Sequence, residues 1–126
     1  MNNIALERVS APSRVLSQAV VEASKHLKIS SSDLGAIIGF SQPTSSRLLN
    51  HKYAIPEGSK AWELAAHFVR LYRSLSSLVG GDDALATSWL ASPNSAFGEQ
   101  APLSYIKRID GLIHACEYLD AHRATV

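Results

Sequence analysis

Apolar residues recur at helical spacing along most of the chain, and no stretch alternates in the way that a half-buried strand does. Residues 14–28 and 59–78 each place apolar side chains on one helical stripe. Shorter helices are predicted at 32–38 and 42–50, and another from Asp82 or Asp83 to about Leu90. The first stripe comprises Val15, Leu16, Ala19, Val20, Ala23 and Leu27. The pattern therefore predicts an all-α protein.

Cap and breaker residues mark where these helices begin and end. Ser41 is the expected N-cap of the helix at 42–50, and Pro43 lies in its first turn, where a missing amide costs nothing. Gly80-Gly81 ends the long helix. After a corner at Pro93-Asn94, we expect a further helix from Pro102, bent or broken at Gly111, that continues to about His122. The corner is expected to lay these final helices on the helix that carries Trp89.

Composition narrows the class of protein. The chain has 126 residues, 46% of them hydrophobic and 18% charged, which is typical of one folded domain or two small ones that share a core. The net charge of +1 gives no strong overall field, so any nucleic-acid binding must rest on a local arrangement of basic residues. No apolar run approaches the roughly 18 residues of a membrane span, and the start of the chain has no secretory signal pattern. A cytoplasmic location is the expectation.

Residues 34–52 have the spacing of a helix-turn-helix. Gly35 is small where two helices cross closely, and Gly39 lies in the turn, where a positive φ favours glycine. The apolar contacts that fix the angle between the helices come from Ile38, Phe40 and Leu48. The segment resembles the Xre/Cro/phage-repressor type of helix-turn-helix. It departs from that pattern at Ser45, where an apolar core residue is usual, and at His51, where glycine commonly closes the second helix.

The second helix of this motif carries the candidate DNA contacts. Its N-terminal end enters the major groove in proteins of this type, where glutamine can read adenine and arginine can read guanine. The expected base contacts are Gln42, Pro43, Ser46 and Arg47, and the expected phosphate contacts at the helix ends are Ser41, Asn50 and Lys52. Arg14, Lys60 and Arg73 are weaker phosphate candidates. A helical hairpin that reads no DNA is the alternative to this interpretation.

The C-terminal part carries a second pattern, which runs from Trp89 to the last amphipathic helix. It consists of Trp89-Leu90, Pro93-Asn94, Phe97-Gly98, Pro102-Leu103 and Gly111. This pattern resembles the toxin-binding domain of the Xre/MbcA/ParS antitoxin family. With the helix-turn-helix, the resemblance covers about residues 14 to 122. Glu99 and Gln100 stand where the family commonly has a second glycine and a small polar residue.

The resemblance implies an antitoxin with three segments. These are a flexible leader (1–13), a DNA-binding region (14–80) and a toxin-binding domain with a C-terminal tail (81–126). It further implies a RES-domain toxin that consumes NAD as partner, operator DNA, and a homodimer or higher assembly. No cofactor is expected on this chain, because the NAD chemistry belongs to the toxin. The tail is expected to cover the toxin's active site, with contacts from Tyr118, Ala121, His122, Arg123, Ala124, Thr125 and Val126.

Other residues of potential chemistry have plainer interpretations. The five histidines show no ligand spacing with each other or with acidic clusters, so no metal site is predicted. Cys116 lies on an apolar stripe without a partner base, which indicates a buried role, and no arrangement typical of an enzyme is present. Two alternatives to an antitoxin remain open. One is a stand-alone repressor with a dimerising C-terminal domain, and the other is an adaptor whose helix-turn-helix no longer binds DNA.

Overall fold

The computed structural model describes residues 9–124, and this part of the chain folds entirely into helices and their connections. In chain order the helices are α2 (Ala11–Leu27), α3 (Ser31–Ile38), α4 (Gln42–Leu49), α5 (Lys60–Leu78), α6 (Asp83–Ala91), the short 3-10 helix η1 (Ser95–Phe97), α7 (Pro102–Tyr105) and α8 (Ile109–Ala124). The predicted all-α class is confirmed. The predicted long helix at 59–78 is α5, with Ser59 as its N-cap.

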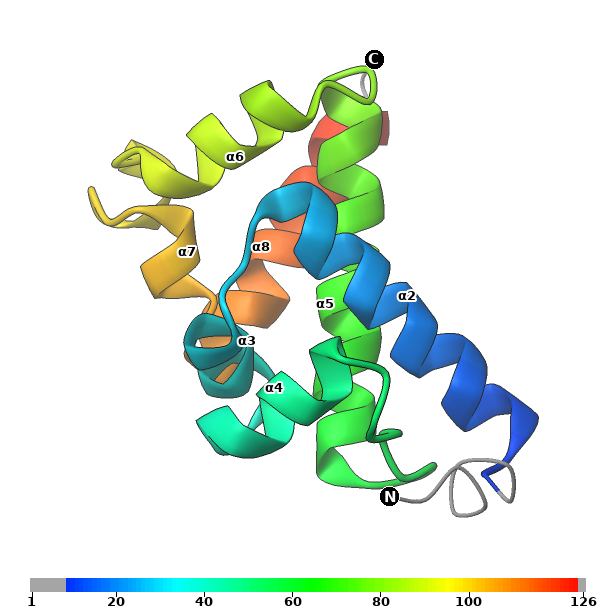
Figure 1. The fold of residues 1–126 in the computed structure, drawn as a ribbon. Coiled ribbons are helices and arrows are strands. Elements are labelled where there is room, and N and C mark those ends of the chain that lie inside the picture. Colours follow the sequence, from blue (N-terminus) through cyan, green and yellow to red (C-terminus); the bar gives the residue numbers. More distant parts are fainter. Residues whose placement is uncertain (1–8, 125–126) are drawn as a thin grey trace.

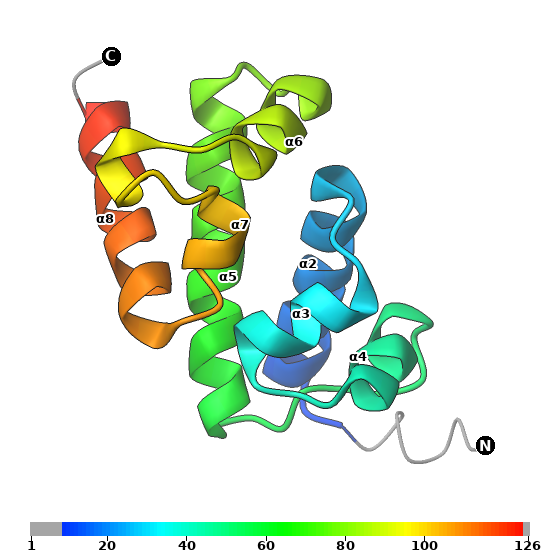
Figure 2. The same cartoon turned by 90° about the vertical axis from the view of Figure 1, so that its left-hand side faces the viewer.

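Helix α5 stands in the middle of the molecule. Helices α2, α3 and α4 lie on one side of it and α8 on the other, α6 lies at its C-terminal end, and α7 packs on α6 and α8 (Figures 1 and 2). Phe68, Leu71 and Leu75 of α5 are fully buried between these two sides. Burial of apolar surface on both faces of one helix ties the N-terminal and C-terminal halves into one core.

The first helix begins earlier than the sequence pattern indicated. Helix α2 starts at Ala11, because the Ser10 hydroxyl accepts from the Ser13 amide and a proline occupies the first turn. The prediction of a flexible leader through residue 13 is therefore wrong for residues 11–13. Ser13 is buried and donates a hydrogen bond to the Ile55 carbonyl. Val15, placed on the buried stripe by periodicity, is instead 65% exposed.

The break between the last two helices lies before Gly111, not at it. The chain leaves helical geometry at residues 106–108, and Gly111 is in the first turn of α8. A Cβ at this position would lie 1.9 Å from the Tyr105 carbonyl oxygen. Gly111 is thus required for the close approach of α7 and α8, while α8 itself continues unbroken to Ala124.

The final helix packs along α5, not on the helix that carries Trp89. Cys116 of α8 contacts His67 of α5, and Asp120 of α8 contacts Arg70 of α5. Residue numbers rise together along both helices, so the two helices run in the same direction. Of the two final helices, the short α7 makes the main contact with α6. The expectation that the corner places all final helices on α6 is wrong, because α5 offers the longer apolar face.

Two polar contacts join α2 and α3 to the segment that follows α5, outside the core. His26 at the end of α2 lies 2.7 Å from the Asp83 carboxylate at the start of α6. Lys107, between α7 and α8, lies 2.8 Å from the Asp33 carboxylate of α3. The division of the chain near residue 80 stays a prediction.

Candidate functional site

The α3–α4 hairpin has the geometry that its glycines and caps predict. Gly39 ends α3 with φ of 86°, and Ser41 caps α4 by accepting from the Thr44 amide. A Cβ on Gly35 would lie 2.5 Å from the Phe40 carbonyl oxygen and 2.9 Å from the Ser45 hydroxyl. Gly35 and Ser45 therefore mark a close crossing of the two helices. This crossing explains the small residue at 45, where an apolar residue is usual in the motif.

The outer face of α4 is polar and open to solvent. Ser41, Gln42, Pro43, Arg47, Asn50 and Lys52 are exposed, and Ser46 is half-buried. The Gln42 amide nitrogen donates to the Ser31 hydroxyl of α3 at 2.8 Å, which holds this side chain against the first helix of the hairpin. Arg47 donates to the Thr44 hydroxyl at 3.1 Å. All seven sequence-predicted residues thus lie along one short helix and its two ends.

The C-terminal end of α4 closes through His51. Its amide donates to the Leu48 carbonyl and the Lys52 amide to the Arg47 carbonyl, which is a Schellman cap. His51 adopts φ of 62°, a left-handed conformation that glycine reaches at lower cost. The departure from the usual glycine therefore leaves the cap intact and introduces backbone strain.

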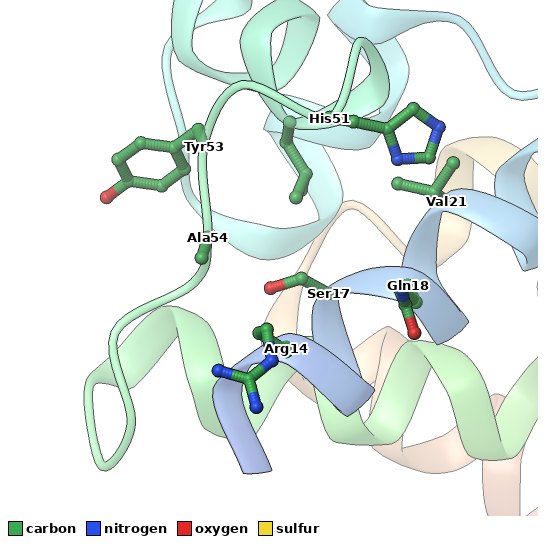
Figure 3. Close-up of a pocket in the computed structure, with 8 residues that line it drawn as sticks. Arg14, Ser17, Gln18, Val21, His51, Tyr53 and Ala54 are labelled. Atoms are coloured by element: carbon green, nitrogen blue, oxygen red, sulfur yellow. The ribbon is translucent and has the colours of Figure 1, made fainter. Parts of the chain in front are cut away.

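A pocket of about 140 Å³ lies between α2 and the segment that follows α4 (Figure 3). Arg14, Gln18, His51 and Tyr53 are among the residues that line it. Arg14 donates to the Val9 carbonyl at 2.6 Å. The weaker phosphate candidate Arg14 is thus close to the C-terminal end of α4.

The other two weaker candidates lie elsewhere. Lys60, at the start of α5, pairs with Glu63 at 3.2 Å. Arg73 lines a separate groove between α2 and α5. The structure therefore does not bring Arg73 together with the exposed face of α4.

The corner after α6 is a tight loop closed by backbone pairing. The Asn94 side chain accepts from the Ala96 amide at 2.9 Å and caps η1, as expected for an asparagine that holds a turn. The Asn94 amide also donates to the Gln100 carbonyl at 3.0 Å. Gly98 and Glu99 both have a positive φ, of 67° and 66°. Glu99 therefore adopts a left-handed backbone that glycine reaches at lower cost.

Phe97 contacts aromatic side chains from α6, α7 and α8. It is buried, with its ring 4.7 Å from that of Tyr105 and 5.2 Å from that of Tyr118. The half-buried Trp89 contacts it edge-on at 5.8 Å. The Tyr105 hydroxyl lies 2.6 Å from His114 Nδ1. The corner thus inserts Phe97 between α6, α7 and α8 and fixes how they pack.

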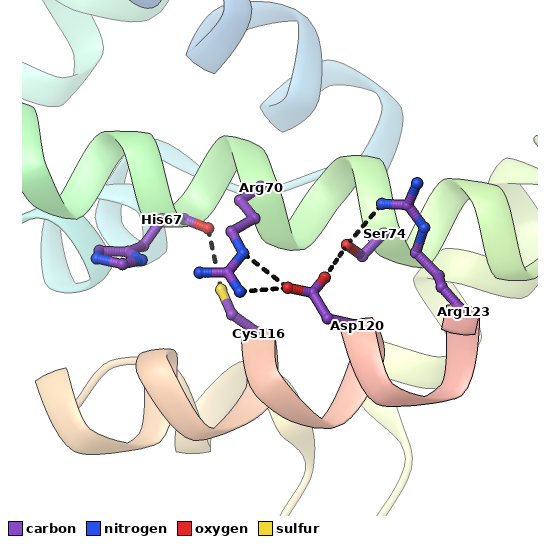
Figure 4. Close-up of polar contacts among 6 residues, drawn as sticks. All are labelled: His67, Arg70, Ser74, Cys116, Asp120 and Arg123. Atoms are coloured by element: carbon purple, nitrogen blue, oxygen red, sulfur yellow. Dashed lines mark hydrogen bonds and ion pairs between the residues drawn. The ribbon is translucent and has the colours of Figure 1, made fainter. Parts of the chain in front are cut away.

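A polar network holds the end of α8 against α5 (Figure 4). The Asp120 carboxylate accepts from the Ser74 hydroxyl at 2.6 Å and from the Arg70 guanidinium, whose Nε lies at 2.8 Å. Arg123 donates to the same Ser74 hydroxyl at 3.1 Å. The Ser74 hydrogen bond, and then Arg70, hold the pKa of Asp120 below its ordinary value.

Cys116 occupies the next position along this contact. Its thiol is buried and donates to the His67 carbonyl at 3.2 Å, as predicted for a structural cysteine. Burial raises the pKa of the thiol to about 11. A thiol that stays protonated at neutral pH is a poor nucleophile.

Sequence reasoning missed this network, although the spacing contains a signal for it. Arg70 and Ser74 are four residues apart on α5. Asp120 and Arg123 share one face of α8, four and seven residues after Cys116. Such spacing places each set on one face of its helix, but it does not tell which helix the face meets.

The residues predicted to contact a toxin lie at the end of α8, and two of them fall outside the described residues. Tyr118 is half-buried, and Ala121, His122, Arg123 and Ala124 are exposed. Their helical geometry shows that the expected placement of Arg123 beyond the final helix is wrong. Thr125 and Val126 lie outside residues 9–124. His122 Nδ1 is 2.8 Å from the Tyr118 carbonyl oxygen, and the two rings are 4.2 Å apart.

Two further properties concern the described part of the chain. Within it, no group of three or more His, Cys, Asp or Glu residues is placed to hold a metal ion. No helix among residues 9–124 is long and apolar enough to cross a bilayer.

Comparison with known families gives one match. Residues 74–124 match the family model of the antitoxin Xre/MbcA/ParS C-terminal toxin-binding domain. This range begins with the Ser74 that holds Asp120 and ends with the last residue of α8. The comparison with curated proteins gives no match. Residues 74–124 are therefore similar to the toxin-binding domain of the Xre/MbcA/ParS antitoxins, and this similarity indicates an antitoxin role.

Proposed function

We propose that this antitoxin neutralises a RES-domain toxin that consumes NAD, and that it represses its own operon through the α3–α4 hairpin. The proposal is supported by the match to a toxin-binding domain at residues 74–124 and by the α3–α4 hairpin, whose second helix has an exposed polar face. The toxin-binding part blocks the toxin, and the hairpin binds the operator as a two-fold assembly. Catalytic chemistry belongs to the toxin and not to this chain.

Neutralisation is assigned to the C-terminal end of α8. Small exposed residues, Ala121 and Ala124, occupy its last turn, so a narrow cleft can accept this end of the helix. The Asp120 network fixes the direction of that turn relative to α5. Thr125 and Val126, which lie outside the described residues, are assigned to the same proposed site from the sequence alone. The mechanism is steric occlusion of the NAD cleft, in which the antitoxin and NAD compete.

Kinetics on the purified toxin test this mechanism. The full chain is titrated against NAD consumption, and its association rate is measured at low and high NAD. Occlusion predicts that high NAD slows association and that Ala124→Trp weakens inhibition. Ala36→Trp is the matched control, since Ala36 is also exposed but lies on α3, outside the family-matched range. Association that is independent of NAD, together with full inhibition by Ala124→Trp, contradicts the proposal.

DNA recognition is assigned to the N-terminal end of α4. The Gln42 amide nitrogen donates one hydrogen bond to the Ser31 hydroxyl. Its second N–H and its carbonyl oxygen remain available for a bidentate contact with adenine. Arg47 uses one donor on Thr44 and has others for guanine. Pro43 and Ser46 supply neighbouring contacts in the groove. Ser41, Asn50 and Lys52 lie at the helix ends, where phosphates are the expected partners.

Operator binding as a function of salt separates these roles. Arg47→Ala is expected to lose about 1–3 kcal/mol on the operator and to relax specificity at one base pair. Lys52→Ala is expected to weaken all DNA sequences alike and to flatten the salt dependence. Arg108→Ala is the control, because Arg108 is exposed between α7 and α8, outside the hairpin, and its side chain pairs with Asp110. Unchanged operator binding by Arg47→Ala refutes this orientation of α4.

A further inference from the structure

An open apolar groove runs between α2 and α5, away from the exposed face of α4. Its volume is about 460 Å³. Val15 and Leu16 of α2 form one wall, and Trp62 and Val69 of α5 form the other. Val15 is 65% exposed, the highest value among the large apolar side chains of residues 9–124. An exposed patch of this kind in a folded chain indicates a surface for another protein.

The two ends of the α5 wall carry different chemical groups. Trp62, Ala66, Val69 and Arg73 follow one another at helical spacing on the same face and all line the groove. An indole therefore lies at one end of the stripe and a guanidinium at the other, about 16 Å apart along the helix. The two central residues are small or medium in size, which permits another helix to approach closely.

Positive charge gathers at the Arg73 end of the groove. Arg70 and Arg123 also line it, but each already donates to the network around Asp120 and Ser74. The Arg73 side chain makes no ion pair or hydrogen bond with any other residue in the 9–124 part of the chain. Its guanidinium is therefore available to a partner.

We propose that the occupant of this groove is a second copy of the same chain, with α5 packed antiparallel on α5 about a two-fold axis. This inference rests on the two-fold DNA-binding mode of the proposed function and names its surface. In such a pairing Arg73 of each copy lies over Trp62 of the other, and Ala66 lies opposite Val69. A guanidinium over an indole face is a favourable cation–π contact.

The charge distribution selects the antiparallel orientation. A parallel pairing would bring the two arginine-rich ends together, with mutual repulsion, and would leave both indoles without a cation. The antiparallel pairing separates the like charges by the length of the stripe. Trp62 of each copy then meets Arg73 of the other copy, so the same surface serves both copies, as a two-fold interface requires.

Sedimentation equilibrium of the purified chain, without DNA or toxin, tests the proposal. The wild-type chain is expected to dimerise, and Val15→Glu is expected to raise the dimer dissociation constant by at least about tenfold. Leu85→Glu is the matched control, because Leu85 is 55% exposed on α6, outside the groove. Both positions are open to solvent, so thermal unfolding is expected to show that both variants remain folded.

Two substitutions at Trp62 test the orientation. Trp62→Glu and Trp62→Lys lose the same indole packing but place opposite charges beneath the partner's Arg73. At low salt the lysine variant is expected to dimerise about tenfold more weakly than the glutamate variant, and added salt is expected to reduce the difference. Equal dissociation constants for the two variants overturn the antiparallel pairing.

The remaining outcomes each overturn the proposal in a recognisable way. A wild-type chain that stays monomeric shows that no second copy fills the groove, and loss of toxin binding in Val15→Glu then identifies the toxin as the occupant. A dimer that Leu85→Glu disrupts and Val15→Glu does not places the interface on α6. Neutralisation and operator binding are measured separately, so failure of the proposed function is distinguishable from failure of this interface.

Discussion

The carboxylate of Asp120 is the most informative single group to remove. It accepts one hydrogen bond from Ser74 and two from Arg70, and its side chain is 32% exposed while that of Arg70 is 49% exposed. Simple exposed ion pairs contribute about 0.2–1 kcal/mol, and fully buried charge-assisted hydrogen bonds contribute more. For this partly screened arrangement, in which one carboxylate oxygen accepts from Arg70 and the other from Ser74, we expect Asp120→Asn to lower the free energy of unfolding by about 1–2 kcal/mol.

The loss of unfolding free energy caused by Asp120→Asn is expected to be larger at neutral pH than in acid. The folded-state pKa of Asp120 lies below its ordinary value, so the carboxylate contributes stability above the unfolded-state pKa of about 4 and loses it as pH falls through the folded-state pKa. Urea unfolding of both proteins, followed by circular dichroism, is therefore expected to show the full difference at neutral pH. The difference is expected to shrink below about pH 4.

Asp110→Asn is the matched control for Asp120→Asn. Asp110 lies in the first turn of the same helix, and its pKa is also lowered by an arginine, Arg108, but both side chains are 75% exposed. Solvent screens such a pair, so its removal is expected to have a much smaller effect. Equal losses in the two variants, or a loss for Asp120→Asn that does not change with pH, would refute the reasoning.

Three further substitutions are expected to change the free energy of unfolding, each measured by urea denaturation. Ser45→Ala is expected to stabilise the fold by about 1 kcal/mol, because the buried Ser45 hydroxyl has no hydrogen-bond partner among residues 9–124. A loss of stability in Ser45→Ala contradicts the interpretation that this hydroxyl is unpaired. His51→Gly is expected to gain about 0.5–1 kcal/mol by relieving the left-handed backbone, and no gain means that the position is unstrained. Gly111→Ala is expected to lower the free energy of unfolding by more than about 3 kcal/mol, because the new Cβ would clash with the Tyr105 carbonyl. An unchanged free energy of unfolding shows that α7 moves away freely.

Local signals in the sequence predicted much of the helical architecture. Ser41 and Pro43 define the start of α4, and Asp82 caps α6, because a cap needs only residues three or four positions away. The same reasoning applies to Ser10 and Pro12, which start α2. Their signal was present, but the apolar stripe that follows suggested a later beginning.

Long-range partners could not be predicted in the same way. Periodicity assigns Asp120 to a face of its helix, but its partner Arg70 lies fifty positions away, and only the packing of α8 on α5 brings the two together. Val15 fits the apolar stripe of α2 equally well as a core residue or as part of an open groove. Gly111 signals either a bend or a close approach, and the position of α7 decides between them.

Inhibition of the toxin by the purified chain tests the central claim most directly. The RES-domain protein is assayed for NAD consumption while the antitoxin is titrated, with the wild-type chain and Ala124→Trp compared in parallel. We predict that the wild-type chain abolishes NAD consumption at a stoichiometric ratio and that Ala124→Trp requires a large excess. Undiminished NAD consumption in the presence of excess folded wild-type chain would contradict the assignment of this antitoxin to a RES-domain toxin.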